Sequence, residues 1–139
     1  MPSPATSTPT ARPSAAPFTW LRRFLALDAV VTGGNGVGYL AASAPLGRLL
    51  GVDSALLLGV GVFLVLYGAA VGLLAARPRP GSGAVAAVIG ANALWVLVSL
   101  AAVPVLAPGV AGMVWIPLQA AVVAGFAALQ YGALRSVRR

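Results

Sequence analysis

The sequence contains no cysteine, no histidine, no lysine and no glutamate, and its only acidic side chains are Asp28 and Asp53. The absence of cysteine excludes disulfides, thiolate metal sites and thiol redox chemistry. The absence of histidine excludes histidine-ligated metals, histidine-ligated haem and a histidine general base. With so few candidate acids and bases, we expect a protein that is not an enzyme and that holds no metal and no cofactor.

Charge of either sign is also scarce. Charged residues make up 8% of the chain, whereas soluble domains carry about 25%. Hydrophobic residues make up 60%, and the mean hydropathy is +0.96. A soluble domain of this size leaves roughly a third of its chain's surface in water, and this composition offers too little polar surface for that. The sequence therefore predicts a protein whose solvent is lipid.

Four apolar segments are long enough to cross a bilayer, and no pattern indicates a strand. Pro45 and Gly47 end the first, Asp53 caps the second, and a Pro108-Gly109 turn separates the last two. We predict an all-α, four-helix transmembrane bundle in which short connections make sequence neighbours antiparallel. The predicted helices span about 24–44, 54–76, 84–106 and 110–134.

The predicted domain organisation is a disordered cytoplasmic tail over residues 1–17, a transmembrane domain over 18–135 and a basic cytoplasmic end over 136–139. The tail holds five prolines and almost nothing to bury. In the membrane domain, Phe18–Arg23 is predicted as an interfacial entry, because Trp20 suits the headgroup level. The segment 45–54 is predicted to run along the opposite surface.

Nine arginines carry all of the positive charge, and with the two aspartates they give a net charge of +7. With four spans, eight of them lie on the side that holds both termini, and Arg48 alone lies on the other. Positive charge favours the cytoplasmic side, so we expect a multi-pass protein of the bacterial inner membrane with both termini in the cytoplasm. No basic run carries interleaved aromatics, so nucleic acid is not an expected partner. The expected partners are the lipid bilayer and a second membrane protein or a second copy of the chain.

Polar residues follow one face of the first predicted helix. Asp28, Thr32, Asn35 and Tyr39 are spaced by four, three and four residues. Such a stripe will not face hydrocarbon, because polar groups there need partners. Further polar and aromatic positions recur at helical spacing on the other predicted helices: Asn92 and Ser99, then Trp115, Gln119, Phe126 and Gln130, with hydroxyls on Tyr67 and Tyr131.

Two interpretations of this candidate polar site stay open. One is a small cavity for an ion, a proton or a headgroup, formed by Asp28, Thr32, Asn35, Tyr39, Asn92, Ser99 and Gln119. The other is interhelical hydrogen bonding that only holds the helices together. Asp28 has further alternatives of its own. An ion pair with Arg77 or Arg79, a favourable position in the first helical turn, and a proton or cation site are all compatible with the sequence.

Glycines mark the expected helix contacts. On the first helix, Gly34 and Gly38 stand four apart, and on the second, Gly61, Gly68 and Gly72 share one face. Small residues at this spacing let membrane helices approach closely, so these five positions are predicted to pack against a neighbour.

A shift of 57 residues aligns VTGGNGVGYL (31–40) with VIGANALWVL (88–97) and pairs Asn35 with Asn92. The match suggests that the first helical hairpin is duplicated as the second, about an axis along the membrane normal. On this hypothesis, the two asparagines are equivalent and both point to the centre of the bundle near mid-membrane.

The segments LALDAVVTGGNGVGYL (25–40), ANALWVLVSL (91–100) and LQAAVVAGFAALQYGALR (118–135) carry a resemblance to a known group. The chain resembles the small, uncharacterised four-helix integral membrane proteins of high-GC bacteria, and it is more loosely similar to DoxX-like proteins. The resemblance implies the fold and brings no activity with it. Small multidrug-resistance transporters are also similar in having four helices and one acid in the first, but that acid is a glutamate and not an aspartate such as Asp28.

The function expected from the sequence is that of a non-enzymatic integral membrane protein, an assembly or partner subunit. The alternative is a small transporter or channel with a polar site around Asp28, Asn35 and Asn92.

Overall fold

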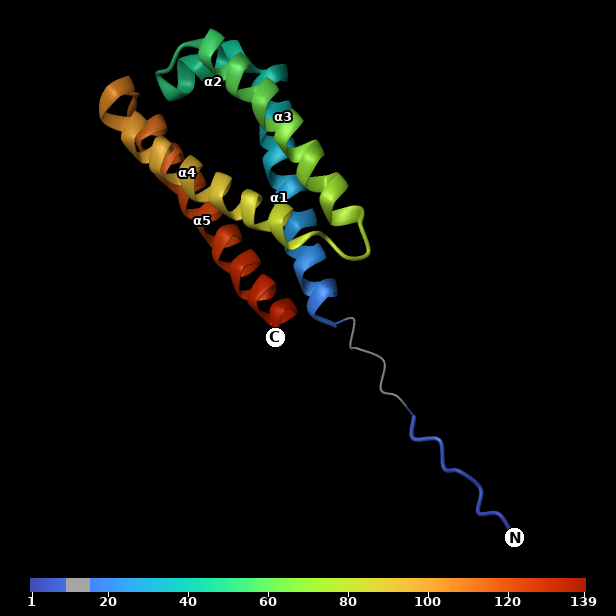
Figure 1. The fold of residues 1–139 in the computed structure, drawn as a ribbon. Helices are drawn as coiled ribbons and strands as arrows, with labels where there is room; N and C mark the ends of the chain where they lie inside the picture. Colours follow the sequence, from blue (N-terminus) through green and yellow to red (C-terminus); the bar gives the residue numbers. More distant parts are fainter. Residues whose placement is uncertain (10–15) are drawn as a thin grey trace.

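The computed structural model describes residues 1–9 and 16–139 and contains five helices in that part of the chain. They are α1 (Ala16–Ala41), α2 (Ser43–Leu50), α3 (Ser54–Ala76), α4 (Ser82–Leu106) and α5 (Val110–Arg138). Four of them, all but α2, are long and apolar enough to cross a membrane. The predicted all-α four-helix bundle is thus confirmed (Figure 1).

The start of α1 corrects the sequence prediction. The helix begins at Ala16 and not near residue 24, so the expected interfacial entry is itself helical. Leu21 and Leu25, one turn apart, are wholly buried and belong to an apolar core cluster with residues of α3, α4 and α5. Burial of this face holds the segment in the helix. In the predicted tail, residues 1–9 are exposed and carry neither helix nor strand, and residues 10–15 lie outside the described residues.

The connection between α1 and α3 is also different from the prediction. The first helix ends at Ala41 because Ala42 leaves the helical backbone region, with φ −134°. Pro45 and Gly47 do not end it. They lie instead in α2, and Pro45 falls in its first turn, where a missing N–H is tolerated. Gly51 then adopts φ +70°, the left-handed conformation that favours glycine, and Asp53 caps α3 by accepting from the Ala55 N–H.

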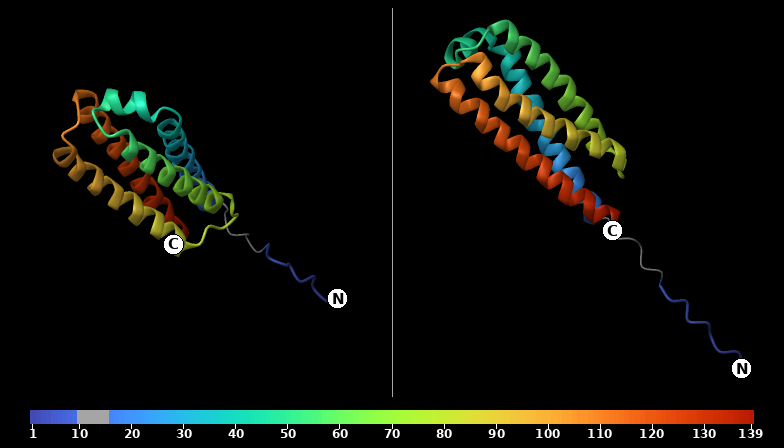
Figure 2. Two further views of the ribbon diagram at one scale, coloured as in Figure 1. Left: turned by 90° about the horizontal axis from the view of Figure 1, so that it is seen from above. Right: turned by 60° about the vertical axis from the view of Figure 1, so that its left-hand side comes forward.

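Two helical hairpins make up the bundle. α1 packs along α3, and α4 packs along α5, with a third contact between α1 and α5. By contrast, α3 and α4 approach each other at few positions, so the seam between them is the loosest in the bundle. In Figures 1 and 2 the start of α1, the α3–α4 loop and the end of α5 lie at one end, which we call the terminal end. The opposite end, with α2 and the α4–α5 turn, is the turn end.

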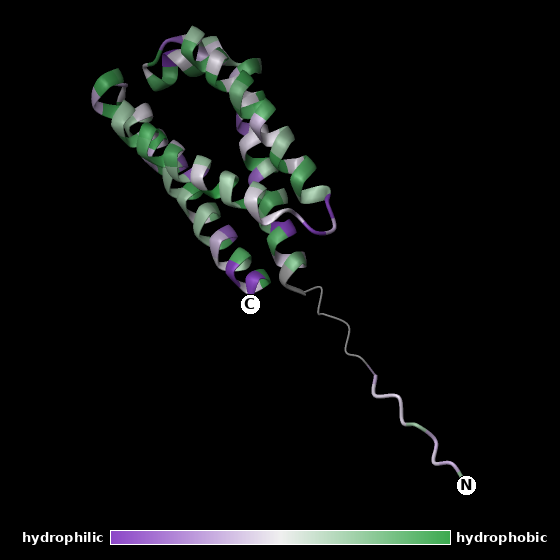
Figure 3. Cartoon of the chain, viewed as in Figure 1, coloured by the Kyte–Doolittle hydropathy of each residue, from purple (hydrophilic) through white to green (hydrophobic). Residues whose placement is uncertain are grey.

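The distribution of polar and apolar residues matches the arrangement of the long helices. In Figure 3 the long helices are coloured as largely apolar, and hydrophilic residues gather at the terminal end, on the α3–α4 loop and the end of α5. Many large apolar side chains face outward, including Val30, Leu66, Leu73 and Val105, each more than 65% exposed. Such a surface suits hydrocarbon and would be costly in water.

Glycines bring α1 and α3 together, but not all at the predicted positions. A Cβ on Gly36 would stand 2.9 Å from the Gly61 carbonyl oxygen, and one on Gly68 would stand 2.9 Å from the Gly33 backbone. Gly72 makes an ordinary contact with Ala29. Gly34 and Gly38, by contrast, have nothing within 4 Å of where a Cβ would stand. The prediction that Gly34 and Gly38 pack against another helix of this chain is therefore wrong. The rotation of α1 about its axis places Gly36, and not these two glycines, against α3.

The turn end joins the two hairpins. The Gly109 N–H donates to the Leu50 carbonyl at 3.0 Å, which links the end of α2 to the α4–α5 turn. Both flanking glycines are required at this contact. A Cβ on Gly51 would clash with the Gly109 nitrogen, and a Cβ on Gly112 would clash with the Leu50 carbonyl oxygen. The seam between α3 and α4 is thus bounded by a backbone contact at the turn end and by the apolar core cluster of Leu21, Leu25 and their neighbours at the terminal end.

Candidate functional site

Asp28 is the centre of the first polar cluster. Its carboxylate is wholly buried, and three neutral groups from three helices donate to it. The Thr32 hydroxyl lies 2.9 Å from Oδ1, while the side-chain amides of Asn92 and Gln130 lie 2.8 and 2.7 Å from Oδ2. These bonds tie α1 to α4 and α5 through side chains, although the backbones of α1 and α4 are far apart.

Tyr67 completes this group, which we call the Asp28 cluster: Asp28, Thr32, Tyr67, Asn92 and Gln130. The Tyr67 hydroxyl donates to Asn92 Oδ1 at 2.9 Å, and Asn92 Nδ2 also lies 3.2 Å from Gln130 Oε1. Every buried side-chain nitrogen and oxygen in the described part of the chain has a hydrogen-bond partner. A fully satisfied buried network of this kind fixes the relative positions of the helices that carry it.

The arginine partners suggested for Asp28 are not found in the structure. Across residues 1–9 and 16–139 its carboxylate makes no ion pair, and Arg79 lies instead over the ring of Phe18, at 5.9 Å. Arg22, six residues before Asp28, donates to the Ala75 carbonyl at 2.9 Å. The proposed first-turn position also fails, because α1 begins at Ala16 and has no acid in its first turn.

A second polar group, the Gln119 cluster, lies nearer the turn end and consists of Asn35, Tyr39, Trp115 and Gln119. Gln119 Oε1 accepts from Asn35 Nδ2 at 3.3 Å and from the Tyr39 hydroxyl at 3.4 Å. The Trp115 indole N–H donates to the Tyr39 oxygen at 2.7 Å. This cluster connects α1 with α5 and does not reach Asp28.

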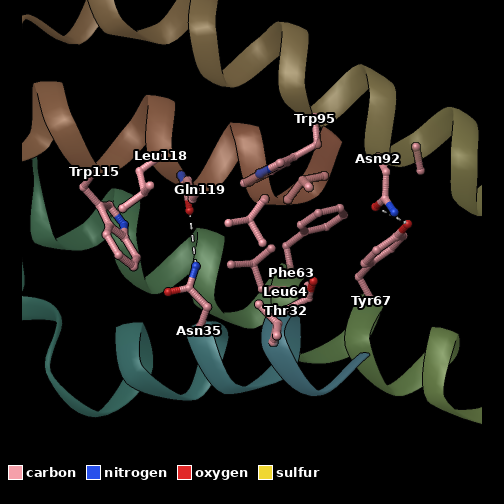
Figure 4. Close-up of a pocket in the computed structure, with 14 residues that line it drawn as sticks. Thr32, Asn35, Phe63, Leu64, Tyr67, Asn92, Trp95, Trp115, Leu118 and Gln119 are labelled. Atoms are coloured by element: carbon pink, nitrogen blue, oxygen red, sulfur yellow. Dashed lines mark hydrogen bonds between the residues drawn. The ribbon is translucent and has the colours of Figure 1, made fainter. Parts of the chain in front are cut away.

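A cavity of about 330 Å³ separates the two clusters, and it lies among α1, α3, α4 and α5, beside the seam between α3 and α4. We call it the seam cavity. Thr32, Tyr67 and Asn92 border it on the side of the Asp28 cluster, and Asn35 and Gln119 border it on the other. Figure 4 shows the Asn35–Gln119 pair at one end and the Tyr67–Asn92 pair at the other, with Phe63 and Leu64 between them.

Aromatic rings cross the loose seam beside this cavity. Phe63 of α3 stacks on Trp95 of α4 with ring centroids 5.7 Å apart, and it also stacks on Tyr67 at 5.9 Å. Phe63 is half exposed on the outer surface. Side chains, not backbone packing, therefore close the cavity towards the surroundings of the bundle. Side-chain rotation is fast compared with helix movement, so this wall can rearrange without a movement of the helices.

A second cavity, of about 450 Å³, continues towards the turn end. Trp95, Trp115 and Gln119 border both cavities. Ser99 is buried and borders only the second. It stands two turns along α4 from Asn92 and takes no part in the Asp28 cluster.

The predicted site residues therefore fall into two groups that the sequence did not separate. Asp28, Thr32 and Asn92 meet in one cluster, Asn35, Tyr39 and Gln119 meet in the other, and Ser99 belongs to neither. The repeat hypothesis makes Asn35 and Asn92 equivalent. In the structure, Asn92 donates to Asp28. Asp28 precedes Asn35 on α1 by two helical turns, or about 10 Å. The two asparagine side chains therefore lie at different depths in the bundle.

Gln130 and Tyr67 are members of the Asp28 cluster that the predicted site omits. The signal for Gln130 was its spacing from Trp115, Gln119 and Phe126, and the signal for Tyr67 was a lone hydroxyl in an apolar helix. Tyr131, the other candidate hydroxyl, is 53% exposed and lies beside Arg135 at 5.7 Å.

The described residues contain no group of three or more acidic side chains that would hold a metal ion. The chemistry on offer at both clusters is hydrogen bonding by amides and hydroxyls around an apolar, aromatic cavity. Comparison of the chain with protein-family models, with curated proteins and with solved structures finds no match.

Proposed function

We propose that this protein is a non-enzymatic integral membrane protein that binds a small amphipathic molecule, taken from the bilayer, in the seam cavity. The observation that carries the proposal is the seam itself. It borders a cavity of about 330 Å³ that amide groups line, and the stacked rings of Phe63 and Trp95 lie across the seam beside it. A concave, mostly apolar site with a few convergent polar groups is the usual form of a small-molecule site.

The closed terminal end favours binding over a channel. Leu21, Leu25 and Val85 are wholly buried there and, with Leu134, form a packed apolar layer between the Asp28 cluster and the end of the bundle. An ion crossing this layer would leave its hydration behind without gaining ligands. Access through the α3–α4 seam needs only the side chains of Phe63 and Trp95 to move.

The membrane location and its orientation belong to the same proposal. The chain lies in a bacterial inner membrane with the terminal end in the cytoplasm, because eight of the nine arginines occur in segments that begin or end there. A reporter that is active only in the cytoplasm, fused after Arg139, should be active. Activity of a periplasmic reporter at the same position would contradict the orientation.

Filling the cavity tests the proposed binding. Ala91 borders the seam cavity, and Ala93, on the same helix, is exposed on the outer surface. We expect Ala91→Phe to remove a small molecule that co-purifies with the wild type in mild detergent, as detected by mass spectrometry of the organic extract. Ala93→Phe adds the same side chain to the lipid-facing surface and should leave the bound molecule in place. A wild-type extract without such a molecule, or equal amounts from the Ala91→Phe variant, would contradict the proposal.

A further inference from the structure

The amide pair of the Gln119 cluster contains one nitrogen and one oxygen that make no hydrogen bond at all. Asn35 Nδ2 donates to Gln119 Oε1, which also accepts from Tyr39. No hydrogen bond within residues 1–9 and 16–139 involves Asn35 Oδ1 or Gln119 Nε2. Neither atom is fully enclosed, since every buried side-chain nitrogen and oxygen in that part of the chain is paired. Both side chains border the seam cavity.

This conclusion does not depend on which way the two amides are turned. If both amide groups were rotated by a half turn, Gln119 Nε2 would donate to Asn35 Oδ1 and to the Tyr39 oxygen. Within the amide pair, the unused atoms would then be Asn35 Nδ2 and Gln119 Oε1, again one donor and one acceptor, while the Tyr39 hydroxyl hydrogen would lose its acceptor. The amide pair offers the cavity one of each in either arrangement.

In apolar surroundings, it costs free energy to leave these two atoms without hydrogen bonds. Most of the other lining residues are aromatic or aliphatic, Trp95, Trp115 and Leu118 among them, and no charged side chain of the described residues borders the cavity. A polar group without a partner in such surroundings loses the hydrogen bonds that water would give it. A ligand that supplies both missing partners recovers them, whereas an ionic headgroup would meet no opposite charge in the wall.

We propose that the seam cavity selects an uncharged amphipathic molecule whose headgroup places a donor beside an acceptor, as a primary carboxamide does. The acceptor of the headgroup binds Gln119 Nε2, and its donor binds Asn35 Oδ1. The apolar part of the molecule lies along Phe63 and Trp95 towards the seam. This inference rests on the proposed binding function and adds the chemical class of the ligand.

Two brominated probes of equal chain length test it. One is a long-chain primary amide, and the other is its N,N-dimethyl derivative, which keeps the acceptor and loses the donor. Bromine on the chain quenches tryptophan fluorescence at short range, and a Trp20→Phe background leaves only Trp95 and Trp115 of the cavity to report. The protein is studied as the full chain in lipid nanodiscs, and quenching is followed as each probe is added.

We expect saturable quenching by the primary amide with an affinity about fivefold to tenfold higher than that of the dimethylamide, the effect of one buried hydrogen bond. Asn35→Leu removes the oxygen that accepts from the headgroup donor and should abolish this preference. Ser99→Ala, which changes a polar residue of the neighbouring cavity, should keep it.

The outcomes separate the two proposals. Equal, saturable binding of both probes to the wild type would overturn the selectivity for a donor and leave the proposed binding function standing. A preference that survives Asn35→Leu would overturn the assignment to the amide pair. Quenching that rises without saturation for both probes would contradict binding in the cavity and therefore both proposals.

Discussion

Asp28→Leu should lower the free energy of unfolding by about 2–4 kcal/mol, the largest effect expected from any polar substitution in this chain. The leucine removes the acceptor of the Thr32 hydroxyl and of the Asn92 and Gln130 amides, all of them in buried or partly buried positions. Two of these bonds join different helices, where a hydrogen bond averages only about 0.6 kcal/mol, and the Thr32 bond lies within α1, so the three bonds alone reach at most the lower limit. The higher limit reflects donors left without any partner. Unfolding in mixed micelles with increasing sodium dodecyl sulfate, followed by circular dichroism, measures the change.

Three controls identify the cause of this effect. Asp28→Asn keeps one oxygen acceptor and should lose less stability than the leucine variant. Asp53→Ala removes the only other acid, an exposed N-cap, and should cost about 1 kcal/mol. Adding Asn92→Leu and Gln130→Met to Asp28→Leu removes the stranded donors, so the triple variant should recover part of the loss. If Asp28→Leu were no more destabilising than Asp53→Ala, the cluster would not contribute to stability as described.

Gly36→Val should separate α1 from α3 and cost about 3 kcal/mol or more. The position where a Cβ would stand lies 2.9 Å from each of three atoms of α3, two of which belong to its backbone, at Gly61 and Val65. Backbone cannot rotate away as a side chain can, so the helices must move apart and lose their close contact. The same unfolding titration measures the loss.

Gly34→Val is the matched control, two residues away on the same helix. It introduces the same β-branched side chain into the same helical environment, but nothing lies within 4 Å of its Cβ. We expect a change within about 0.5 kcal/mol, as for other substitutions away from contacts. Equal destabilisation by the two variants would mean that helix propensity, and not the contact with α3, decides the result.

Much of the fold could be predicted because it depends on composition and on the capping, proline and glycine residues that begin and end the helices. The second predicted helix, 54–76, coincides with α3, whose start is marked by Asp53 and whose end is marked by Arg77-Pro78. The long uncharged run from residue 80 to 134 was divided correctly at Pro108-Gly109. The limits of α1 were missed because Leu21 and Leu25 favour a helix only once there is a core to receive them.

The candidate site was predicted less completely, for a geometric reason. Helical spacing places Asp28, Thr32, Asn35 and Tyr39 on one face, and it does so correctly. It contains no information on the register of α1 against α4 and α5. Along that face, Asp28 lies level with Asn92 and Gln130, whereas Asn35 and Tyr39 lie level with Trp115 and Gln119, so one predicted stripe forms two clusters.

By itself, the sequence determined that the fold is an all-α bundle with four helices apolar enough to span a membrane, because hydropathy, segment length and the proline and glycine breaks are local properties. Only the tertiary structure decided which residues meet. The rotation of α1 makes Gly36 and not Gly34 the contact with α3, and the register of the hairpins surrounds Asp28 with neutral donors. The loose contact between α3 and α4 leaves the cavity at their seam. Contacts between helices depend on distances across the bundle, and those are set only when all the helices pack together.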